Sequence, residues 1–370
     1  MIYLDNGATS FHKPHQVMDA VGRAMRTCAN PGRGGYSAAM HAAKTVYDCR
    51  EQAAAMFDCD PEQVAFTSNC THGLNIAIGT LVRPGDPVIV SGFEHNAVTR
   101  PLHALGAKIT IAGRKLFDQA DTLENFEKAL KRGAKAAVFT HVSNVFGYIL
   151  PVEEMAVLCK KYGVPFVIDG AQSAGTLPLS LKRLEADFIA IPGHKGLLGP
   201  QGTGLLLCGS QPIPLLRGGT GSNSKMQEMP RELPDALEAG TLNVPGIAGL
   251  AQGIRYLRRV GLCSVAQREK RQAKRCTEAL MRMGFRVFSG ENQSGTVSFV
   301  PDIDCEEFAQ KLASHGIAVR AGLHCAPTAH ESAGTLDSGT VRVSFGADAT
   351  DAQTDAFLKT IKVLEMKKYL

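Results

Sequence analysis

The chain has 370 residues, of which 44% are hydrophobic, so it can bury one large core and a smaller one. Its 40 basic and 35 acidic residues leave a net charge of +5, an excess too small to indicate nucleic acid binding. No apolar segment approaches the ~20 residues of a membrane span, and the N-terminus lacks the pattern of a signal peptide. The ten cysteines include no C-x-x-C pair, which disfavours zinc-ribbon, ferredoxin and thioredoxin-type sites, and scattered thiols favour a cytoplasmic protein.

Alternating strand and helix patterns occupy the first two thirds of the chain. Apolar residues at helical spacing predict an opening helix over 17–28, and two later helical patterns cover 123–130 and 152–162. Apolar β-rich runs predict buried strands at 64–67, 87–91, 108–112, 136–141, 165–169, 188–191 and 204–208. This alternation predicts an α/β unit with a mostly parallel seven-stranded sheet flanked by helices.

The pattern changes after residue 250. Helical stretches at 246–260, 264–283, 304–315 and 350–367 are interleaved with strand-like runs at 286–288, 296–300, 318–320 and 340–344. We therefore expect a large domain over 15–245 and a smaller α+β domain formed by 1–14 and 246–370. The stretch 218–243 is rich in Gly, Pro and Ser, and an irregular segment of this length indicates a functional or interface role.

Two polar residues follow neighbouring predicted strands. Lys195 lies among glycines in I-P-G-H-K-G, and Asp169 ends the strand in V-I-D-G-A-Q. Alpha/beta sheets bind ligands at the carboxyl ends of their strands. A lysine that can form a Schiff base and an acid that can pair with a pyridinium nitrogen are the two parts that pyridoxal phosphate requires. An exposed turn lysine and a helix-capping aspartate are the alternatives for each residue alone.

Two further segments suggest chemistry. Thr71 lies where a strand gives way to a helix, so it can bind phosphate or simply cap the helix. Cys325 follows His324 in a loop with Gly and Pro, which suits an exposed nucleophile. A metal site of His324, Cys325 and His330 is disfavoured, because it offers only three ligands without regular spacing, and no metal site is predicted. The other nine cysteines, such as Cys208 in an apolar strand, are expected to be core or incidental residues.

Taken together, these segments resemble the cysteine desulfurases of the class V aminotransferase superfamily, which has the fold type I architecture. The matching motifs occur in family order: Y-L-D-N at 3–6, S-N-V-F-G at 143–147, D-G-A-Q at 169–172, G-H-K at 193–195, E-A-G-T at 238–241, R-A-G-L-H-C-A at 320–326 and G-T-V-R-V-S at 339–344. The resemblance implies an enzyme that converts L-cysteine to L-alanine and holds the sulfur as a persulfide for an acceptor protein. Only 17 positions separate Cys325 from Arg342, as in the family's second group.

The resemblance implies roles for residues around the cofactor. Lys195 would bind pyridoxal 5'-phosphate covalently and later move the Cα proton, and Asp169 would pair with the pyridine nitrogen. His95 would stack on the ring. The remaining implied cofactor contacts are Gln172 at the phenolic oxygen, Thr71 and His194 at the phosphate, and Thr241 at the phosphate from the partner of a homodimer.

On the substrate side, the resemblance implies that Asn144 and Arg342 meet the carboxylate, Arg342 as a bidentate clamp. Cys325 would receive the sulfur. Two positions depart from the family pattern: Pro192 replaces a usual Ser or Thr two residues before the histidine, and Tyr36 stands where relatives often have His. The first departure removes one phosphate hydroxyl.

Other functions fit the same sequence less well. A selenocysteine lyase with L-selenocysteine as substrate would use the same scaffold. An aminotransferase or racemase would share Lys195 and Asp169 but would not need Cys325. The presence of the lysine, the acid, the histidine and the cysteine together argues against a non-catalytic sulfur carrier or scaffold protein. A dinucleotide-binding protein is disfavoured, because the glycines at 199, 202 and 204 precede a strand rather than a helix. We expect no membrane contact and no direct nucleic acid binding.

Overall fold

The computed structural model describes residues 1–32, 34–222 and 224–366. Its largest sheet has seven strands in the order β2-β8-β7-β6-β5-β3-β4. The strands are β2 (Val64–Thr67), β3 (Pro87–Ser91), β4 (Lys108–Ala112), β5 (Ala136–Thr140), β6 (Phe166–Asp169), β7 (Phe188–Pro192) and β8 (Gly204–Cys208). Strands β4, β3, β5, β6 and β7 run parallel, whereas β8 is antiparallel to both β7 and β2. The predicted mostly parallel seven-stranded sheet is confirmed.

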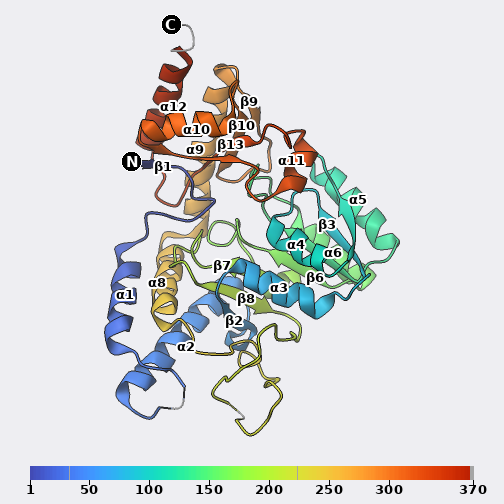
Figure 1. The fold of residues 1–370 in the computed structure, drawn as a ribbon, viewed down its shortest axis with the longest axis vertical. Helices are drawn as coiled ribbons and strands as arrows, with labels where there is room; N and C mark the ends of the chain where they lie inside the picture. The colour runs from blue at the N-terminus through green and yellow to red at the C-terminus, as the bar shows by residue number, and fades with distance from the viewer. Residues whose placement is uncertain (33, 223, 367–370) are drawn as a thin grey trace.

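Helices cover both faces of this sheet (Figure 1). Successive residues of a strand point to opposite faces, so Phe139 of β5 packs into one core cluster and Val138 into the other. Helices α3 (Cys70–Leu81) and α4 (Asn96–Ala104) contribute to the cluster around Val138. Five helices contribute buried residues to the cluster around Phe139: α2 (Ser37–Phe57), α5 (Gln119–Lys131), α6 (Val152–Tyr162), α7 (Leu181–Leu184) and α8 (Val244–Val260). Helix α1 (His15–Thr27) packs on α8.

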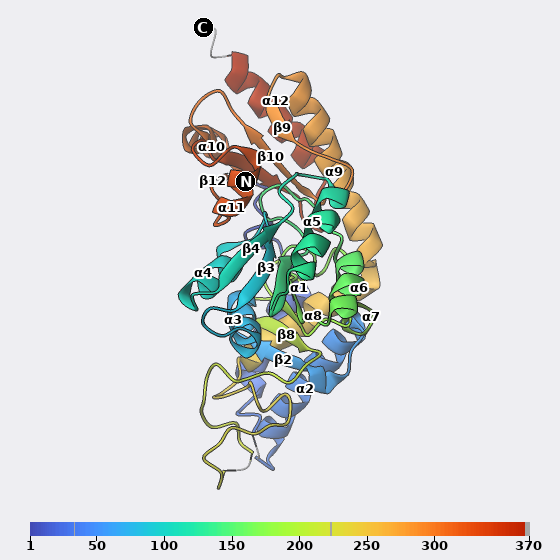
Figure 2. The same ribbon diagram turned by 90° about the vertical axis from the view of Figure 1, so that its right-hand side faces the viewer.

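The C-terminal elements form an α+β layer with its own core. A four-stranded antiparallel sheet has the order β12-β13-β10-β9. Its strands are β9 (Arg286–Phe288), β10 (Thr296–Val300), β12 (Arg320–Gly322) and β13 (Thr340–Ser344). Its helices are α9 (Leu262–Arg282), α10 (Cys305–Ser314), α11 (Pro327–Ala333) and α12 (Asp351–Met366). These elements gather at one end of the molecule with the N-terminus, whereas α2 and the irregular segment before α8 lie at the other (Figures 1 and 2).

Two local features differ from the prediction. The expected strand 318–320 is split between two sheets: β11 (Ile317–Ala318) pairs in parallel with β1 (Ile2–Tyr3), and β12 pairs with β13. Helix α2 was not predicted, because its sequence carries many alanines and therefore a helix propensity rather than a clear apolar period. Within the described part of the chain, no helix has the length and apolar character needed to cross a bilayer.

Candidate active site

The parallel sheet brings the predicted lysine and acid to one edge. Asp169 is the last residue of β6 and is only 2% exposed. Lys195 follows three residues after the end of the adjacent strand β7, and Asp169 is aligned with Ala190 of that strand. Both residues therefore lie at the carboxyl ends of neighbouring parallel strands, where α/β sheets bind their ligands.

The Asp169 carboxylate is held on one side only. Its Oδ1 accepts hydrogen bonds from the Ala171 backbone N–H at 2.9 Å and from the Cys70 thiol at 3.3 Å. Among the described residues, none donates to Oδ2. A buried carboxylate with one oxygen fixed and the other open fits a protonated ring nitrogen, which would supply the missing donor. The site thus has a place for the pyridinium of pyridoxal phosphate.

The Lys195 amine lies in a strongly perturbed environment. Burial lowers the pKa of Lys195 below its ordinary value, and the positive charges of Arg342 and Arg320 act in the same direction, whereas Asp169 opposes them. No described residue forms a hydrogen bond or ion pair with the amine. A lowered pKa raises the fraction of neutral amine, which is the form that condenses with an aldehyde or accepts a proton.

The expected phosphate ligands lie beside this edge. Thr71 is exposed in the first turn of α3, whose N-cap residue Asn69 accepts a hydrogen bond from the His72 backbone at 2.9 Å. A helix N-terminus offers free backbone donors to an anion. His194 Nδ1 lies 3.0 Å from the Thr9 hydroxyl, and burial lowers the pKa of His194 to about 4, so its ring is neutral at pH 7. Thr241 is exposed and lines a cavity with His72 of the same chain.

Gln172 and His95 approach the site from two different loops. Gln172 Nε2 donates to the Gly7 carbonyl at 2.9 Å, which ties the loop after β6 to the N-terminal segment. His95 is the N-cap of α4, and its Nδ1 accepts the Ala97 N–H at 3.0 Å. Burial lowers the pKa of His95, so the neutral ring carries its proton on Nε2. A neutral, fixed imidazole can stack on an aromatic ring.

Sequence reasoning missed the buried acid before this histidine. Glu94 is fully buried and accepts hydrogen bonds from the Thr140 N–H, at 3.0 Å to each oxygen, and from the Ser91 N–H and hydroxyl. Burial raises the pKa of Glu94 to about 8, although these hydrogen bonds oppose the rise. Glu94 therefore fixes the loop that carries His95 onto β5. The signal in the sequence was an acid directly after the apolar strand and Phe93.

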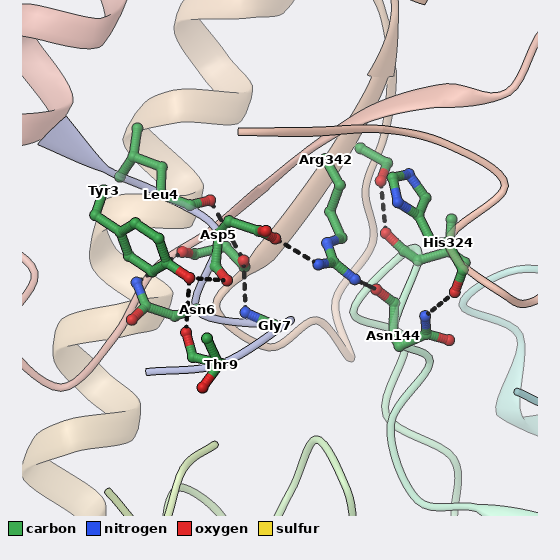
Figure 3. Close-up of polar contacts among 12 residues, drawn as sticks. Tyr3, Leu4, Asp5, Asn6, Gly7, Thr9, Asn144, His324 and Arg342 are labelled. Carbon is green, nitrogen blue, oxygen red and sulfur yellow. Dashed lines mark hydrogen bonds and ion pairs between the residues drawn. The ribbon is translucent and has the colours of Figure 1, made fainter. Parts of the chain in front are cut away.

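Arg342 and Asn144 form the side of the site that polar contacts connect to the N-terminal segment and to His324 (Figure 3). Arg342 of β13 is 2% exposed; its Nη2 pairs with Asp5 Oδ1 at 2.6 Å, and its Nη1 donates to the Asn144 carbonyl at 2.9 Å. The Asn144 Nδ2 donates to the His324 carbonyl at 2.8 Å. Arg342 Nε and Asn144 Oδ1 are buried without a partner. A buried orphan donor and acceptor indicate a polar ligand, and an amino acid offers both complements.

Two charged residues on this side were absent from the predicted site. Asp5 belongs to the first motif of the chain, but only the fold shows that it neutralises Arg342. Arg320 is the residue opposite Arg342 across β12 and β13, is exposed, and acts electrostatically on both Lys195 and His95. Its signal was its place at the start of the R-A-G-L-H-C-A segment.

The cysteine loop is docked onto the segment that carries His95. Cys325 is exposed, and both it and His324 have positive φ angles, 56° and 50°, which non-glycine residues rarely adopt. The Cys325 carbonyl accepts the Asn96 N–H at 2.7 Å. Two more hydrogen bonds join the same two segments. Thr328 Oγ1 donates to the Glu94 carbonyl at 3.1 Å, and Ser332 Oγ donates to the Gly92 carbonyl at 2.8 Å. These bonds hold the backbone of the Cys325 loop against the segment that carries His95.

The alternative metal site of His324, Cys325 and His330 can be compared with the structure. Across residues 1–32, 34–222 and 224–366, no three His, Cys, Asp or Glu side chains are grouped as metal ligands. His330 Nδ1 instead hydrogen-bonds with the Thr335 hydroxyl at 2.8 Å. His324 Nε2 lies 3.2 Å from the Thr340 hydroxyl.

Comparisons with known proteins identify the family of this chain. Residues 2–357 match the family described as aminotransferase class-V. A protein of Pyrococcus abyssi named "Probable cysteine desulfurase" is 34% identical, over 98% of this chain and 94% of its own length. The solved apo structure of a cysteine desulfurase from Thermococcus onnurineus NA1 has a TM-score of 0.91 at 34% identity, covering 98% of this chain and 94% of that chain. The cysteine desulfurase CsdA of Escherichia coli has a TM-score of 0.85 at 26% identity, with 99% and 95% covered. The chain therefore belongs to the aminotransferase class-V family.

Proposed function

We propose that this chain is a pyridoxal-phosphate-dependent cysteine desulfurase that takes sulfur from L-cysteine, releases L-alanine and holds the sulfur on Cys325. The docked cysteine loop carries this proposal: the hydrogen bond from the Asn96 N–H to the Cys325 carbonyl fixes the backbone of an exposed cysteine against the residue that follows His95. An aminotransferase or racemase would need the lysine and the acid but no thiol. The similar proteins that are named as cysteine desulfurases support the same activity.

The residues at the sheet edge would hold the cofactor. Asp169 Oδ2 would accept the ring N–H, Lys195 would bind the aldehyde carbon, and His95 would lie on the ring face. The N-terminus of α3 with Thr71, together with His194, would receive the phosphate. Bound pyridoxal phosphate supplies an electron sink that acidifies the Cα–H bond of an amino acid.

The protein side chains then divide the work on the substrate. The expected bidentate clamp by Arg342, with Asn144 also at the carboxylate, does not fit this geometry, because both Arg342 Nη atoms and Asn144 Nδ2 already have partners. The unpartnered Arg342 Nε–H would instead donate to the substrate carboxylate, and Asn144 Oδ1 would accept from the substrate nitrogen. Lys195, in its neutral form, takes the Cα proton at Nζ. The Cys325 thiolate attacks the substrate sulfur: an S–S bond forms as the C–S bond breaks, and the electron pair of that bond stays with the carbon skeleton, which leaves as alanine after protonation.

The proposal also covers assembly and surroundings. A homodimer would allow Thr241 to reach the partner's phosphate site. Exposed apolar side chains in and just before the irregular segment 218–243 support a homodimer. Among them are Leu215, Leu216 and Met226, which are 49%, 54% and 56% exposed. We also propose that the chain passes its sulfur to an acceptor protein and is located in the cytoplasm. Its large domain would comprise residues 15–245, and its small domain residues 1–14 and 246–370.

Cofactor binding and product analysis test the proposed function. Wild-type protein mixed with pyridoxal phosphate is expected to gain a visible absorbance band, and Lys195→Ala is expected to lose it. Wild type supplied with L-cysteine and a reductant is expected to release alanine and sulfide in equal amounts. A parallel assay with L-selenocysteine, measuring alanine and selenide, tests the alternative function of a selenocysteine lyase. A wild type that gains no band, or that converts cysteine to pyruvate instead of alanine, contradicts the proposal.

A further inference from the structure

A second cysteine lies at the cofactor edge, although the sequence pattern places it among core residues. Cys70 is the first residue of α3 and is 7% exposed. Its Sγ lies 3.3 Å from Asp169 Oδ1 and donates a hydrogen bond to it. The helix thus presents a thiol to the one carboxylate that the cofactor site requires.

The chemistry of this contact allows only one direction of donation. Asp169 is acceptor-only when it is ionised, so the thiol must supply the proton. Burial and the negative charge of Asp169 raise the pKa of Cys70 well above its ordinary value. Cys70 therefore remains a neutral S–H donor through the neutral pH range, unlike a nucleophilic cysteine, which needs a lowered pKa.

The hydrogen bond from Cys70 affects the orientation of the Asp169 carboxylate. The Ala171 N–H and the Cys70 S–H both bind Oδ1, one from the turn after β6 and one from α3. Two donors on the same oxygen restrict rotation of the carboxylate more than one donor does, and they leave Oδ2 open. We propose that Cys70 is a positioning residue that holds the Asp169 carboxylate with Oδ2 facing the protonated ring nitrogen of the cofactor. This inference rests on the proposed cofactor site.

Three variants separate hydrogen bonding from packing. Cys70→Ala removes the donor, and Cys70→Ser keeps a donor on a side chain of similar shape. Cys276→Ala is the matched control, because Cys276 is also buried but lies in the C-terminal core, where burial alone raises the pKa of its thiol. The control therefore removes a buried thiol that forms no hydrogen bond with a carboxylate of any described residue.

The measured quantities are the dissociation constant of pyridoxal phosphate, followed by absorbance or fluorescence, and the kinetic constants for L-cysteine. Cys70→Ala is expected to weaken cofactor binding about fivefold, the scale of one weak donor to a charged group. Its kcat is expected to fall by a similar factor with KM within about twofold of wild type. Cys70→Ser and Cys276→Ala are expected to bind the cofactor within about twofold of wild type.

Two outcomes of the binding measurements overturn the positioning role. Cofactor binding by Cys70→Ala equal to wild type means that the S–H bond has no effect on Asp169. Equally weak binding by Cys70→Ser and Cys70→Ala assigns the loss to packing. If Cys70→Ala does not fold, the infrared S–H stretching band of wild type, identified by its loss in Cys70→Ser, decides: a band at the frequency of a free thiol overturns the proposal. Failure of the proposed function differs from all of these, since wild type itself would then bind no cofactor.

Discussion

The two sides of the candidate site are built in different ways. The side with Lys195 and Asp169 comes from the carboxyl ends of neighbouring buried strands, so backbone pairing within one sheet places both residues. The side with Cys325 comes from a loop with two successive positive φ angles, held by hydrogen bonds to another segment. Sheet pairing is rigid, whereas a docked loop can separate from its support without unfolding either core.

This difference matches the two tasks that the proposed reaction sets. The cofactor must stay in one orientation through every turnover, which suits side chains fixed on a sheet. A persulfide must be presented to an acceptor outside the site, which suits an exposed residue on a loop. We therefore expect substitutions on the sheet side to affect cofactor binding, and substitutions on the loop side to affect sulfur transfer alone.

Cys325→Ala is the sharpest test of that separation and should have the largest effect. Cofactor binding and the spectral change on adding L-cysteine are expected to persist, because Lys195 and Asp169 are untouched. Turnover is expected to fall by about 10³-fold or more, the scale of a lost nucleophile. Stopped-flow absorbance and an alanine assay measure the two properties. Selenium release from L-selenocysteine should fall less, because a carbon–selenium bond is weaker.

Cys263→Ala is the matched control, since Cys263 is also exposed but lies at the start of α9. It should leave both properties unchanged. Wild-type sulfide release by Cys325→Ala would show that Cys325 is a bystander, and the chain would have to be reassigned to β-elimination or transamination.

The Arg342 ion pair supplies the second test. Asp5→Asn removes the charge that compensates a buried guanidinium, so the free energy of unfolding is expected to fall by about 3 kcal/mol, as for other broken buried pairs. A bound amino acid returns a carboxylate to Arg342. Saturating L-alanine, the proposed product, should therefore stabilise Asp5→Asn more than it stabilises wild type, measured as the shift in Tm of cofactor-loaded protein.

The control for this test is Asp348→Asn, because the Asp348–His12 pair is exposed on both sides and should contribute little. Equal stabilisation of wild type and Asp5→Asn by alanine would show that the substrate carboxylate does not reach Arg342.

The same contrast explains how much could be predicted from the sequence. The seven strands of the large sheet and the meeting of Asp169 with the Lys195 loop follow from apolar runs and from parallel pairing, both of which are local rules. The Asp5–Arg342 pair joins residues 337 positions apart, and no local pattern indicates such a contact. The hydrogen bond of Cys70 depends on how α3 is rotated over the sheet, which its sequence period leaves open.

Two buried glutamates extend the comparison to stability. On the sheet side, Glu94 accepts hydrogen bonds from Ser91 and Thr140. Among the C-terminal helices, Glu269 of α9 is 8% exposed, lines a cavity with Lys195 and accepts no hydrogen bond from any residue that the structure describes. Burial raises the pKa of Glu269 from its ordinary value to about 8; nearby Asp348 adds to the rise, and Arg268 opposes it.

The sign of the resulting pH dependence follows from that shift. The folded state binds the Glu269 proton more tightly than the unfolded chain, so this stabilisation is present in full below about pH 4.5 and is lost as pH rises toward 8. Glu269→Gln mimics the protonated acid at every pH. Its free energy of unfolding in urea should match wild type near pH 4.5 and exceed it at pH 8, the difference growing by at most about 1.4 kcal/mol per pH unit.

The difference between variant and wild type is the quantity to measure, because buried histidines and Glu94 contribute their own pH dependence to both proteins. Glu291→Gln, at an exposed site, should show no such growth. Glu94→Gln should instead be less stable than wild type above about pH 8, where wild type carries a carboxylate, because its amide would turn an N–H group toward the backbone donors that bind this carboxylate. A difference for Glu269→Gln that stays constant from pH 5 to 8 would mean that Glu269 is ionised in the folded protein, with water in the cavity solvating it.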